Sequence, residues 1–341
     1  YINYPFYNLD LQKAYIDEAH SKGVKVKLYN TIREITYKAH ELFPMRSFGY
    51  EILNDGEGGG HGWLQEHLGN NYHSAWHATR VNDAAILNKG NSRWTNYYIE
   101  GLNWLAKNQN IDGLYLDDIA FSRETVKRLV QVLHKNRPEV IIDLHSANQF
   151  NPRDGFINSA FLYMEHFPYV TRLWFGEYFD YQADPDYWMT EVAGIPFGLG
   201  GEMLEKGGHP FRGLVYGMTT RVYGDYNPGA IWKLFDSFDI ANARMLGYWV
   251  DDCPVKTNQP GLKSTLYLHS DKALLAIGSW SEQPQNAKPQ IDWDALKLDA
   301  TDYEWIQPAI EGLQDFRRFD TEETIPVKAG QGVVLLLQRK S

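Results

Sequence analysis

A helix followed by a β-strand recurs three times in the first half of the sequence, and this repeat limits the possible folds more than any other feature. Each helical period leads into a short run rich in Val, Ile, Leu and Tyr. The three helix-strand units cover residues 9–30, 91–118 and 122–148. Units that keep one order indicate parallel strands joined by crossover helices, which is the α/β class.

Polar residues end nearly every apolar run of this region. The run at 111–118 ends in two Asp residues, and the run at 140–148 carries an Asp and a His near its end. In a (β/α)8 barrel the carboxyl ends of the strands form the catalytic face, so functional residues gather there from distant segments. We therefore predict a (β/α)8 TIM-type barrel. A doubly wound sheet is the competing architecture, but no GxGxxG follows an early strand.

The predicted strand count is one short of a closed barrel. Further strands are expected at 1–6, 160–166, 194–202 and 245–252, which brings the total to about seven of the eight required. We expect the first strand to lie upstream of Tyr1, or the segment 172–179 to fill the remaining place. The sequence also begins without Met and without a signal peptide, which indicates an excised or processed piece.

A change of pattern divides the sequence into two predicted domains. After Asp252, short β runs are separated by Gly, Pro, Asn and Asp with few helical periods between them, which is typical of antiparallel sheets. We predict a catalytic barrel over 1–255 and a C-terminal β-sandwich over 258–341. Within the barrel, the long Gly-rich stretch at 50–90 is a candidate lid or subsite wall.

Composition excludes several kinds of partner. The net charge is −10 and no run of Lys or Arg stands out, so we expect neither nucleic acid nor an anionic membrane surface as a partner. No apolar stretch approaches the roughly 20 residues of a spanning helix. Cys253 is alone, so the sequence offers no disulfide and no cysteine metal cluster. Aromatic residues make up 14% of the chain, and such rings can stack on sugar faces.

Several sequence blocks resemble a known family. The blocks "NLDLQKAYIDEAHSKGVKVKLYNTIRE", "GLYLDDIAF", "IIDLHSAN", "YMEHFPYV", "LWFGEYFDY", "GIPFGLGGEML" and "RGLVYGMTTR" resemble a bacterial glycoside-hydrolase-domain family near glycoside hydrolase family 123, over roughly residues 1–250. The resemblance implies a glycosidase with a glycan substrate. Those relatives are usually secreted and carry an upstream β-rich domain, which implies a periplasmic or secreted location.

A shorter motif is similar to a more distant family. The stretch from Asp112 to Asp117, D-x-x-Y-x-D, is similar to the fourth-strand motif of the retaining α-galactosidases and α-N-acetylgalactosaminidases, whose second Asp is the nucleophile. The similarity implies that Asp117 is a nucleophile and that the sugar is of the galactose or N-acetylgalactosamine type. Family 123 itself uses an Asp-Glu pair in a substrate-assisted mechanism, and this sequence has Asp117 and Asp118 instead.

Glycoside hydrolysis needs two carboxyl groups in different protonation states. One stays ionised as nucleophile or base, and the other keeps a proton for the leaving oxygen. We assign the ionised role to Asp117. Glu165 is the first choice for the acid, Glu177 the second and Glu202 the third, because each follows an apolar run. Aromatic neighbours around Glu165 and Glu177 would desolvate the carboxylate and raise its pKa, as an acid requires.

Other polar and aromatic residues are expected to contact the substrate rather than to react. We assign a substrate-binding role to Asp118, Asp143, His145, Tyr163, Trp174, Glu202 and Trp249. The carboxylates and His145 would hydrogen-bond sugar hydroxyls, and the rings would stack on pyranose faces.

Two other classes of function remain open, and each gives the same residues a different role. A metal-dependent hydrolase would use Asp117, Asp118, Asp143 and His145 as ligands, and a non-catalytic barrel would only bind carbohydrate. His61, His73 and His77 match no familiar ligand spacing, so we expect no metal in the site and no cofactor. A structural Ca²⁺ at carboxylates ranks ahead of zinc. The sequence does not predict an oligomeric state.

Overall fold

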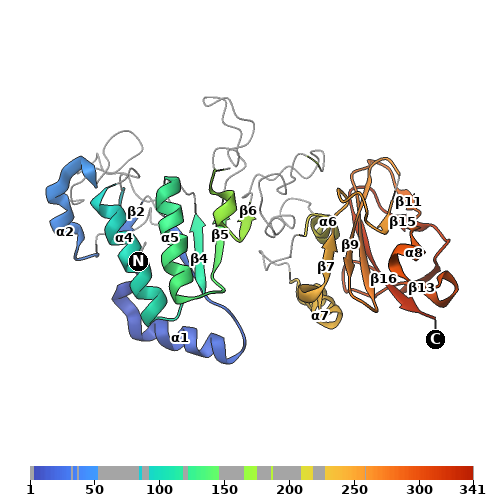
Figure 1. Cartoon of the computed structure of the whole chain (residues 1–341), viewed down its shortest axis with the longest axis horizontal. Coiled ribbons are helices and arrows are strands. Elements are labelled where there is room, and N and C mark those ends of the chain that lie inside the picture. The colour runs from blue at the N-terminus through green and yellow to red at the C-terminus, as the bar shows by residue number, and fades with distance from the viewer. Residues whose placement is uncertain are drawn as a thin grey trace. The chain divides into compact units, whose positions relative to one another are not determined.

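The computed structural model describes residues 4–31, 34–36, 38–52, 84–86, 92–117, 122–145, 165–174, 186, 209–217, 227–257 and 259–340 (Figure 1). Contacts between Cα atoms divide these residues into two units, one up to Trp174 and one from Asp186 onward. Each unit is described by itself below.

The N-terminal unit is built on a parallel sheet with the strand order β1-β4-β5-β6. The strands are β1 (Lys27–Thr31), β4 (Gly113–Asp117), β5 (Ile141–His145) and β6 (Arg172–Trp174). Three helices precede the first three of these strands along the chain: α1 (Leu9–Ser21), α4 (Arg93–Asn108) and α5 (Arg123–Asn136). The predicted helix-strand repeat and its parallel pairing are therefore confirmed.

Shorter elements complete the described part of this unit. They are η1 (Pro5–Asn8), β2 (Glu34–Thr36), α2 (Leu42–Met45), η2 (Arg46–Glu51) and β3 (Ala84–Ile86), and β2 pairs antiparallel with β3.

Local sequence explains where the covering helices begin and which face of the sheet they bury. The Ser92 side chain accepts a hydrogen bond from the Trp94 N–H at the start of α4, and Ser122 does the same for the Thr125 N–H in α5. In α4 the Tyr98 hydroxyl donates to Asn30 Oδ1 at 3.0 Å. Asn30 lies in register with the buried Leu116. The helices therefore cover the strand face that also holds the buried Leu114, Ile142 and Leu144.

The C-terminal unit is built on an antiparallel sheet with the order β14-β13-β16-β10-β9-β7. The strands are β7 (Arg244–Leu246), β9 (Leu262–Leu268), β10 (Ala273–Ser279), β13 (Tyr303–Gln307), β14 (Arg317–Asp320) and β16 (Gly332–Arg339). Two short antiparallel pairs accompany it: β8 (Val255–Lys256) with β12 (Gln290–Ile291), and β11 (Gln285–Ala287) with β15 (Ile325–Val327).

Both faces of the six-stranded sheet are buried. One face packs against the short strand pairs through a core that includes Trp305, Leu275 and Ile325. The other face packs against α6 (Pro210–Val215) and α7 (Gly229–Phe238), through Phe211 and Phe235 among others. The remaining short elements are η8 (Ile240–Asn242), α8 (Trp293–Leu296) and η9 (Ala300–Asp302).

Three of the predicted barrel strands are wrong, as the described residues of each segment show. In 1–6, Pro5 begins the 3-10 helix η1, a position that its fixed φ favours. In 160–166, the described residues Glu165 and His166 belong to a 3-10 turn over 165–169. In 245–252, β7 pairs antiparallel with β9 of the C-terminal sheet, where Leu246 joins the buried core. The expected strand at 194–202 lies outside the described residues.

The alternative expectation for the missing strand is partly met. β6 lies at the start of the segment 172–179 and pairs in parallel with β5. β6 is therefore a parallel strand in addition to the seven that the sequence predicted.

Candidate active site at the carboxyl ends of the parallel strands

The carboxyl ends of the parallel strands lie in one register row. Thr31 pairs with Asp117, Asp117 with His145, and His145 with Trp174. These four residues are the last of β1, β4, β5 and β6. Three of them, Asp117, His145 and Trp174, are residues that the sequence predicted for the site, and for these three the structure describes the backbone. Along the sequence, Asp117 lies 86 residues after Thr31, His145 lies 28 residues after Asp117, and Trp174 lies 29 residues after His145. Strand ends that are distant in the sequence therefore lie side by side in the sheet.

A second row of side chains lies two positions earlier along each strand. It consists of Tyr29, Tyr115, Asp143 and Arg172, which are in register with one another. Since side chains alternate along a strand, this row shares the strand face of the Asp117 row and lies opposite the helix-covered Leu114 and Leu116. The rings of Tyr29 and Tyr115 are stacked, with centroids 5.9 Å apart and planes 19° apart.

Asp143 is the buried anionic centre of an ion cluster. Its side chain is 0% exposed, and Arg172 donates to it twice, from Nε at 3.2 Å and from Nη2 at 2.8 Å. Lys27 Nζ donates to Asp143 Oδ2 as well. Both carboxylate oxygens are therefore engaged by cations. The predicted contact between Asp143 and sugar hydroxyls, or a metal ion in the alternative function, would require this carboxylate to leave its partners.

Gly113 explains how Lys27 reaches Asp143. Lys27 is on β1 and Asp143 on β5, with β4 between them, and Gly113 is the β4 residue in register with Lys27. A glycine leaves the space over β4 free for the lysine side chain. Burial lowers the pKa of Lys27 from its ordinary value, and the nearby Arg172 adds to this effect while Asp143 opposes it.

The first Asp of the D-x-x-Y-x-D motif lies at the opposite end of the sheet from Asp117. Asp112 accepts hydrogen bonds from the Val26 N–H at 2.7 Å and from Arg137 Nη2 at 2.8 Å, and it lies 2.7 Å from His20 Nε2. Burial would raise its pKa, but these hydrogen bonds outweigh burial and hold the pKa below its usual value. Asp112 thus ties α1, β1 and α5 together, which is a structural role.

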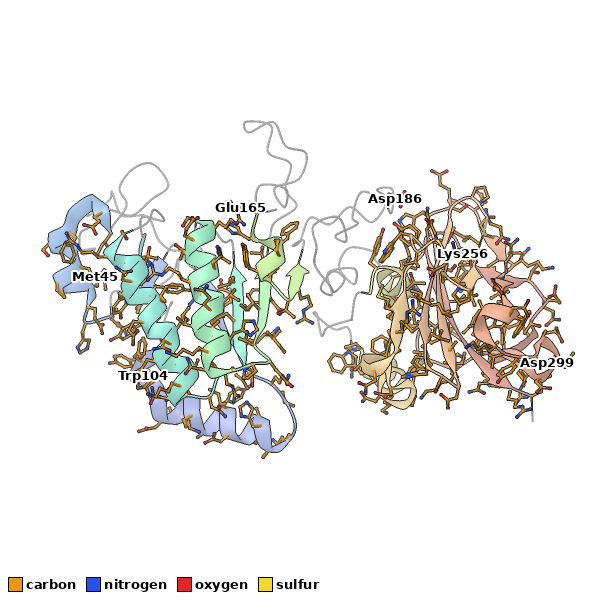
Figure 2. All side chains as sticks on the ribbon, viewed as in Figure 1. Met45, Trp104, Glu165, Asp186, Lys256 and Asp299 are labelled. Atoms are coloured by element: carbon orange, nitrogen blue, oxygen red, sulfur yellow. The ribbon has the colours of Figure 1, made fainter. Side chains whose placement is uncertain are left out.

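Glu165 is more exposed than the sequence predicted. Its side chain is 57% exposed, and it lies 3.8 Å from the Nε2 atom of the buried His166. Arg123, at the start of α5, is an electrostatic neighbour of Glu165, so Glu165 lies toward the carboxyl end of β4 (Figure 2). The expected desolvation of Glu165 is wrong in this structure, because the side chain faces solvent. Its assignment as the acid stays a prediction.

The remaining predicted residues fall into two groups. Trp249 follows β7 in the C-terminal unit, where its ring packs edge-on against Tyr248 with centroids 5.1 Å apart. The other predicted side chains lie outside the described residues: Asp118, Tyr163, Glu177, Glu202, His61, His73 and His77. Among the described residues, no group of three or more His, Cys, Asp or Glu could hold a metal ion.

Of the second row, sequence reasoning predicted Asp143 and missed the other members. Lys27, Tyr29 and Thr31 alternate along β1, and Gly113, Tyr115 and Asp117 alternate along β4. This period-2 pattern, opposite the apolar Leu positions, was the available signal for Tyr29, Tyr115 and Lys27. Arg172 carried no comparable signal, because its strand is only three residues long.

Comparison with known proteins identifies the class that this arrangement represents. The chain matches "Glycoside hydrolase 123, TIM-barrel domain" over residues 1–223 and "Glycoside hydrolase 123, C-terminal domain" over residues 227–338. It is a glycosidase with a TIM barrel followed by a C-terminal antiparallel domain. The chain belongs to glycoside hydrolase family 123, as the sequence blocks predicted.

Solved structures with the same fold are distant in sequence. An α-amylase from Geobacillus thermoleovorans, complexed with acarbose, has a TM-score of 0.58 at 13% identity, over 98% of this chain and 81% of that chain. A maltogenic amylase from S. marinus has a TM-score of 0.55 at 10% identity, over 97% and 54%. A cyclomaltodextrinase has a TM-score of 0.54 at 10% identity, over 97% and 63%. These similarities support the fold alone.

Two further comparisons limit the assignment. A search of curated proteins finds no match. The family comparison does not confirm the more distant similarity to α-galactosidases. Among the described residues, no helix is both long enough and apolar enough to cross a membrane.

Proposed function

We propose that this glycosidase uses Asp117 as its nucleophile and retains the anomeric configuration. The observation that carries the proposal is the register row of Thr31, Asp117, His145 and Trp174 at the carboxyl ends of the parallel strands. Catalytic residues of TIM-barrel enzymes come from such strand ends. The D-x-x-Y-x-D motif, in which Asp117 is the second Asp, supports the nucleophile role and a sugar of the galactose or N-acetylgalactosamine type.

The layer beneath Asp117 favours an ionised carboxylate there. Among the described residues, Lys27 and Arg172 place two positive charges beside the single carboxylate of Asp143. A nearby positive charge stabilises a carboxylate over the neutral acid. The stacked Tyr29 and Tyr115 supply an aromatic surface on the same strand face.

The acid partner of Asp117 is proposed to be Glu165 or Glu177, with Glu202 third. Glu165 is 57% exposed, and Glu177 and Glu202 lie outside the described residues. A retaining enzyme requires the two carboxyl groups to lie about 5 to 5.5 Å apart, whereas an inverting enzyme requires about 6.5 to 9.5 Å.

The test is a panel of aryl glycosides, with galactosides and N-acetylgalactosaminides first. With the best activated substrate, Asp117→Ala is expected to lose nearly all turnover and to recover part of it with azide. The product would be a glycosyl azide of inverted anomeric configuration. Glu165→Ala and Glu177→Ala are tested in the same way to identify the acid. The variant that lacks the acid is expected to yield a glycosyl azide of retained configuration. Full activity of Asp117→Ala would refute the nucleophile assignment.

We also propose that the enzyme needs no cofactor, that any bound Ca²⁺ is structural, and that the protein is periplasmic or secreted. The engagement of both Asp143 oxygens by Lys27 and Arg172 argues against a metal ion at the strand ends. Turnover of the best aryl glycoside is expected to be unchanged after chelation. A loss of turnover that a divalent ion restores would favour the metal-dependent hydrolase instead.

A further inference from the structure

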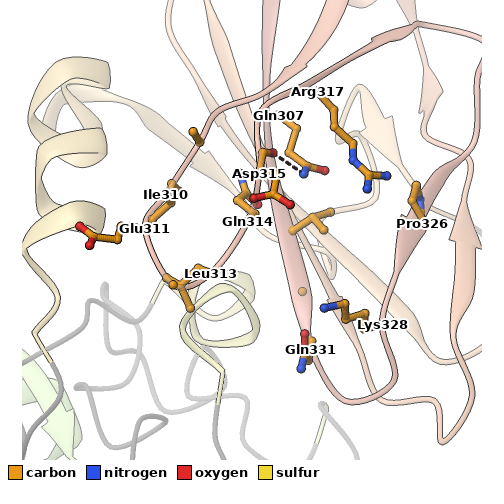
Figure 3. Close-up of a pocket in the computed structure, with 14 residues that line it drawn as sticks. Gln307, Ile310, Glu311, Leu313, Gln314, Asp315, Arg317, Pro326, Lys328 and Gln331 are labelled. Atoms are coloured by element: carbon orange, nitrogen blue, oxygen red, sulfur yellow. Dashed lines mark hydrogen bonds between the residues drawn. The ribbon is translucent and has the colours of Figure 1, made fainter.

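A cavity of about 500 Å³ lies within the C-terminal unit, at the turn that joins β13 to β14 (Figure 3). Its walls come from this turn, from the start of β14 and from the residues after β15. The volume falls within the roughly 300 to 1,000 Å³ that small-molecule sites occupy. Among its lining residues are Asp315, Arg317 and Lys328.

Three charged side chains enter this cavity from separate segments. Figure 3 shows the Arg317 guanidinium, the Lys328 ammonium and the Asp315 carboxylate directed into the same hollow, while Glu311 points away from it. Within the described residues, none of these three side chains forms an ion pair. By contrast Arg318, the next residue on β14, pairs with Glu304 at 2.9 Å. The cavity therefore presents two cations and one carboxylate that no ion pair within the described residues neutralises.

Partly buried hydrogen bonds hold the walls of the cavity in place. Gln314 Nε2 donates to the Pro308 carbonyl at 2.8 Å and to the Val334 carbonyl at 3.1 Å, and its Oε1 accepts from the Val334 N–H at 3.1 Å. The buried Gln307 donates to the Asp315 carbonyl at 2.7 Å. The turn is thus fixed to β13 and β16. Fixed polar groups bind a ligand at a lower entropic cost than mobile ones.

We propose that this cavity is a second binding site, for a saccharide unit that carries one anionic group. A carboxylate or sulfate of the sugar would accept hydrogen bonds from Arg317 and Lys328, and sugar hydroxyls would donate to Asp315. The amides of Gln307 and Gln331 add neutral hydrogen-bonding groups to the lining. The proposal does not depend on which residue in the barrel is the nucleophile, and binding can be measured without turnover.

The experiment compares two anionic probes with a neutral one. Methyl glucuronide, galactose 6-sulfate and methyl glucoside are titrated against the whole protein, and binding is followed by saturation-transfer difference NMR. Methyl glucoside matches methyl glucuronide except for the carboxylate. Saturable binding of at least one anionic probe is expected, with much weaker binding of the glucoside. The two anionic arms distinguish a carboxylate ligand from a sulfate ligand.

Matched variants locate the binding. Arg317→Met is expected to raise the Kd of the anionic probe about tenfold or more, because a charge-assisted hydrogen bond is lost. Arg318→Met removes a neighbouring guanidinium that does not line the cavity, and it is expected to leave the Kd unchanged. Binding of neither anionic probe, or equal Kd values for wild type and Arg317→Met, would overturn the proposal. Thermal unfolding of both variants checks that each is folded.

Discussion

Asp143 illustrates how one buried carboxylate can organise the interior of a barrel. TIM-barrel interiors are commonly filled by layers of branched aliphatic side chains. Here the described inner positions of β1, β4, β5 and β6 include an ion cluster and a tyrosine pair instead. A buried charge without a partner is costly, so the buried Asp143 carboxylate depends on the cations that donate to it.

The cluster predicts an order of destabilisation among single variants. Asp143→Asn removes the fully buried carboxylate that accepts hydrogen bonds from the half-buried Lys27 and Arg172, and it is expected to cost about 3 to 5 kcal/mol of unfolding free energy. Lys27→Met is expected to cost less, because Asp143 keeps both of its bonds to Arg172. Chemical denaturation measures both variants. Asp302→Asn, which breaks the exposed pair with Arg339, is the control and is expected to cost less than about 1 kcal/mol. A greater cost for Lys27→Met than for Asp143→Asn would contradict this account.

His209 predicts a pH dependence of stability in the C-terminal unit. Burial, with smaller effects from Arg212 and Lys328, lowers the pKa of His209 from 6.5 to about 4. Its Nδ1 accepts the Phe211 N–H at the start of α6, which requires a neutral ring. Between pH 6.5 and about 4 the unfolded chain binds a proton that the folded chain does not. Stability is therefore present above pH 6.5 and lost as the pH falls toward 4, by about 3 kcal/mol.

Urea denaturation at pH 7 and pH 4.5 tests this expectation. His209→Asn keeps a side-chain acceptor for the helix start but does not titrate, so the variant should lose less stability than wild type between the two pH values. His134→Asn, at an exposed position, is the control and should behave like wild type. An unchanged pH dependence in His209→Asn would show that other groups cause it.

At the scale of elements, Gly113 fixes the approach of β4 to its neighbour. A Cβ atom at this position would lie 1.7 Å from the Ile141 carbonyl oxygen, which is backbone and cannot rotate away. Gly113→Ala is therefore expected to destabilise the parallel sheet by more than about 4 kcal/mol or to prevent folding. Gly101→Ala in α4 is the matched control, since its Cβ meets only the Phe6 ring at 3.5 Å. That variant is expected to gain about 0.5 to 1 kcal/mol from helix propensity. Circular dichroism during thermal unfolding compares the two, and a stable Gly113→Ala protein would contradict the argument.

The elements that sequence could predict are those with a strong local pattern. The strands at 24–30, 111–118 and 140–148 each follow an amphipathic helix, and the order alone implies parallel pairing. The segment 245–252 also has an apolar run with acidic residues after it, but its strand β7 pairs with β9 in the antiparallel sheet of the C-terminal unit. Local pattern cannot distinguish these two environments, because both bury alternate residues.

The same limit applies to the site. Asp117, His145 and Trp174 could be predicted because each stands at the end of a strand. The partners of Asp143 could not, because Lys27 lies 116 residues away in the sequence and Arg172 lies 29 away. Contacts of that kind depend on sheet register, which the sequence does not show directly.

At the scale of the whole molecule, β1 has a neighbour on only one side among the described residues. Every strand of a closed barrel has two neighbours. Among the described residues β1 pairs only with β4, and a cavity of about 510 Å³, lined by α1, β1 and the buried Leu114, lies next to it. On α1, Leu11 is 72% exposed and Tyr15 is 66% exposed, and both line this cavity. Exposed apolar side chains gathered beside a strand edge indicate a surface that is normally covered.

We therefore expect a further strand to cover this edge, and the strand predicted upstream of Tyr1 stays a prediction for that role. Leu11→Gln and Tyr15→Gln should each cost about 1.5 to 3 kcal/mol of unfolding free energy, as for buried apolar side chains. Phe316→Gln, at a residue 56% exposed in the C-terminal unit, is the control and should change stability by less than about 0.5 kcal/mol. If the α1 variants are as harmless as the control, the face of α1 is solvent-exposed and β1 ends the sheet. A cost confined to the α1 variants would instead mean that a strand beside β1 buries these side chains and closes the barrel next to the residues that carry the chemistry.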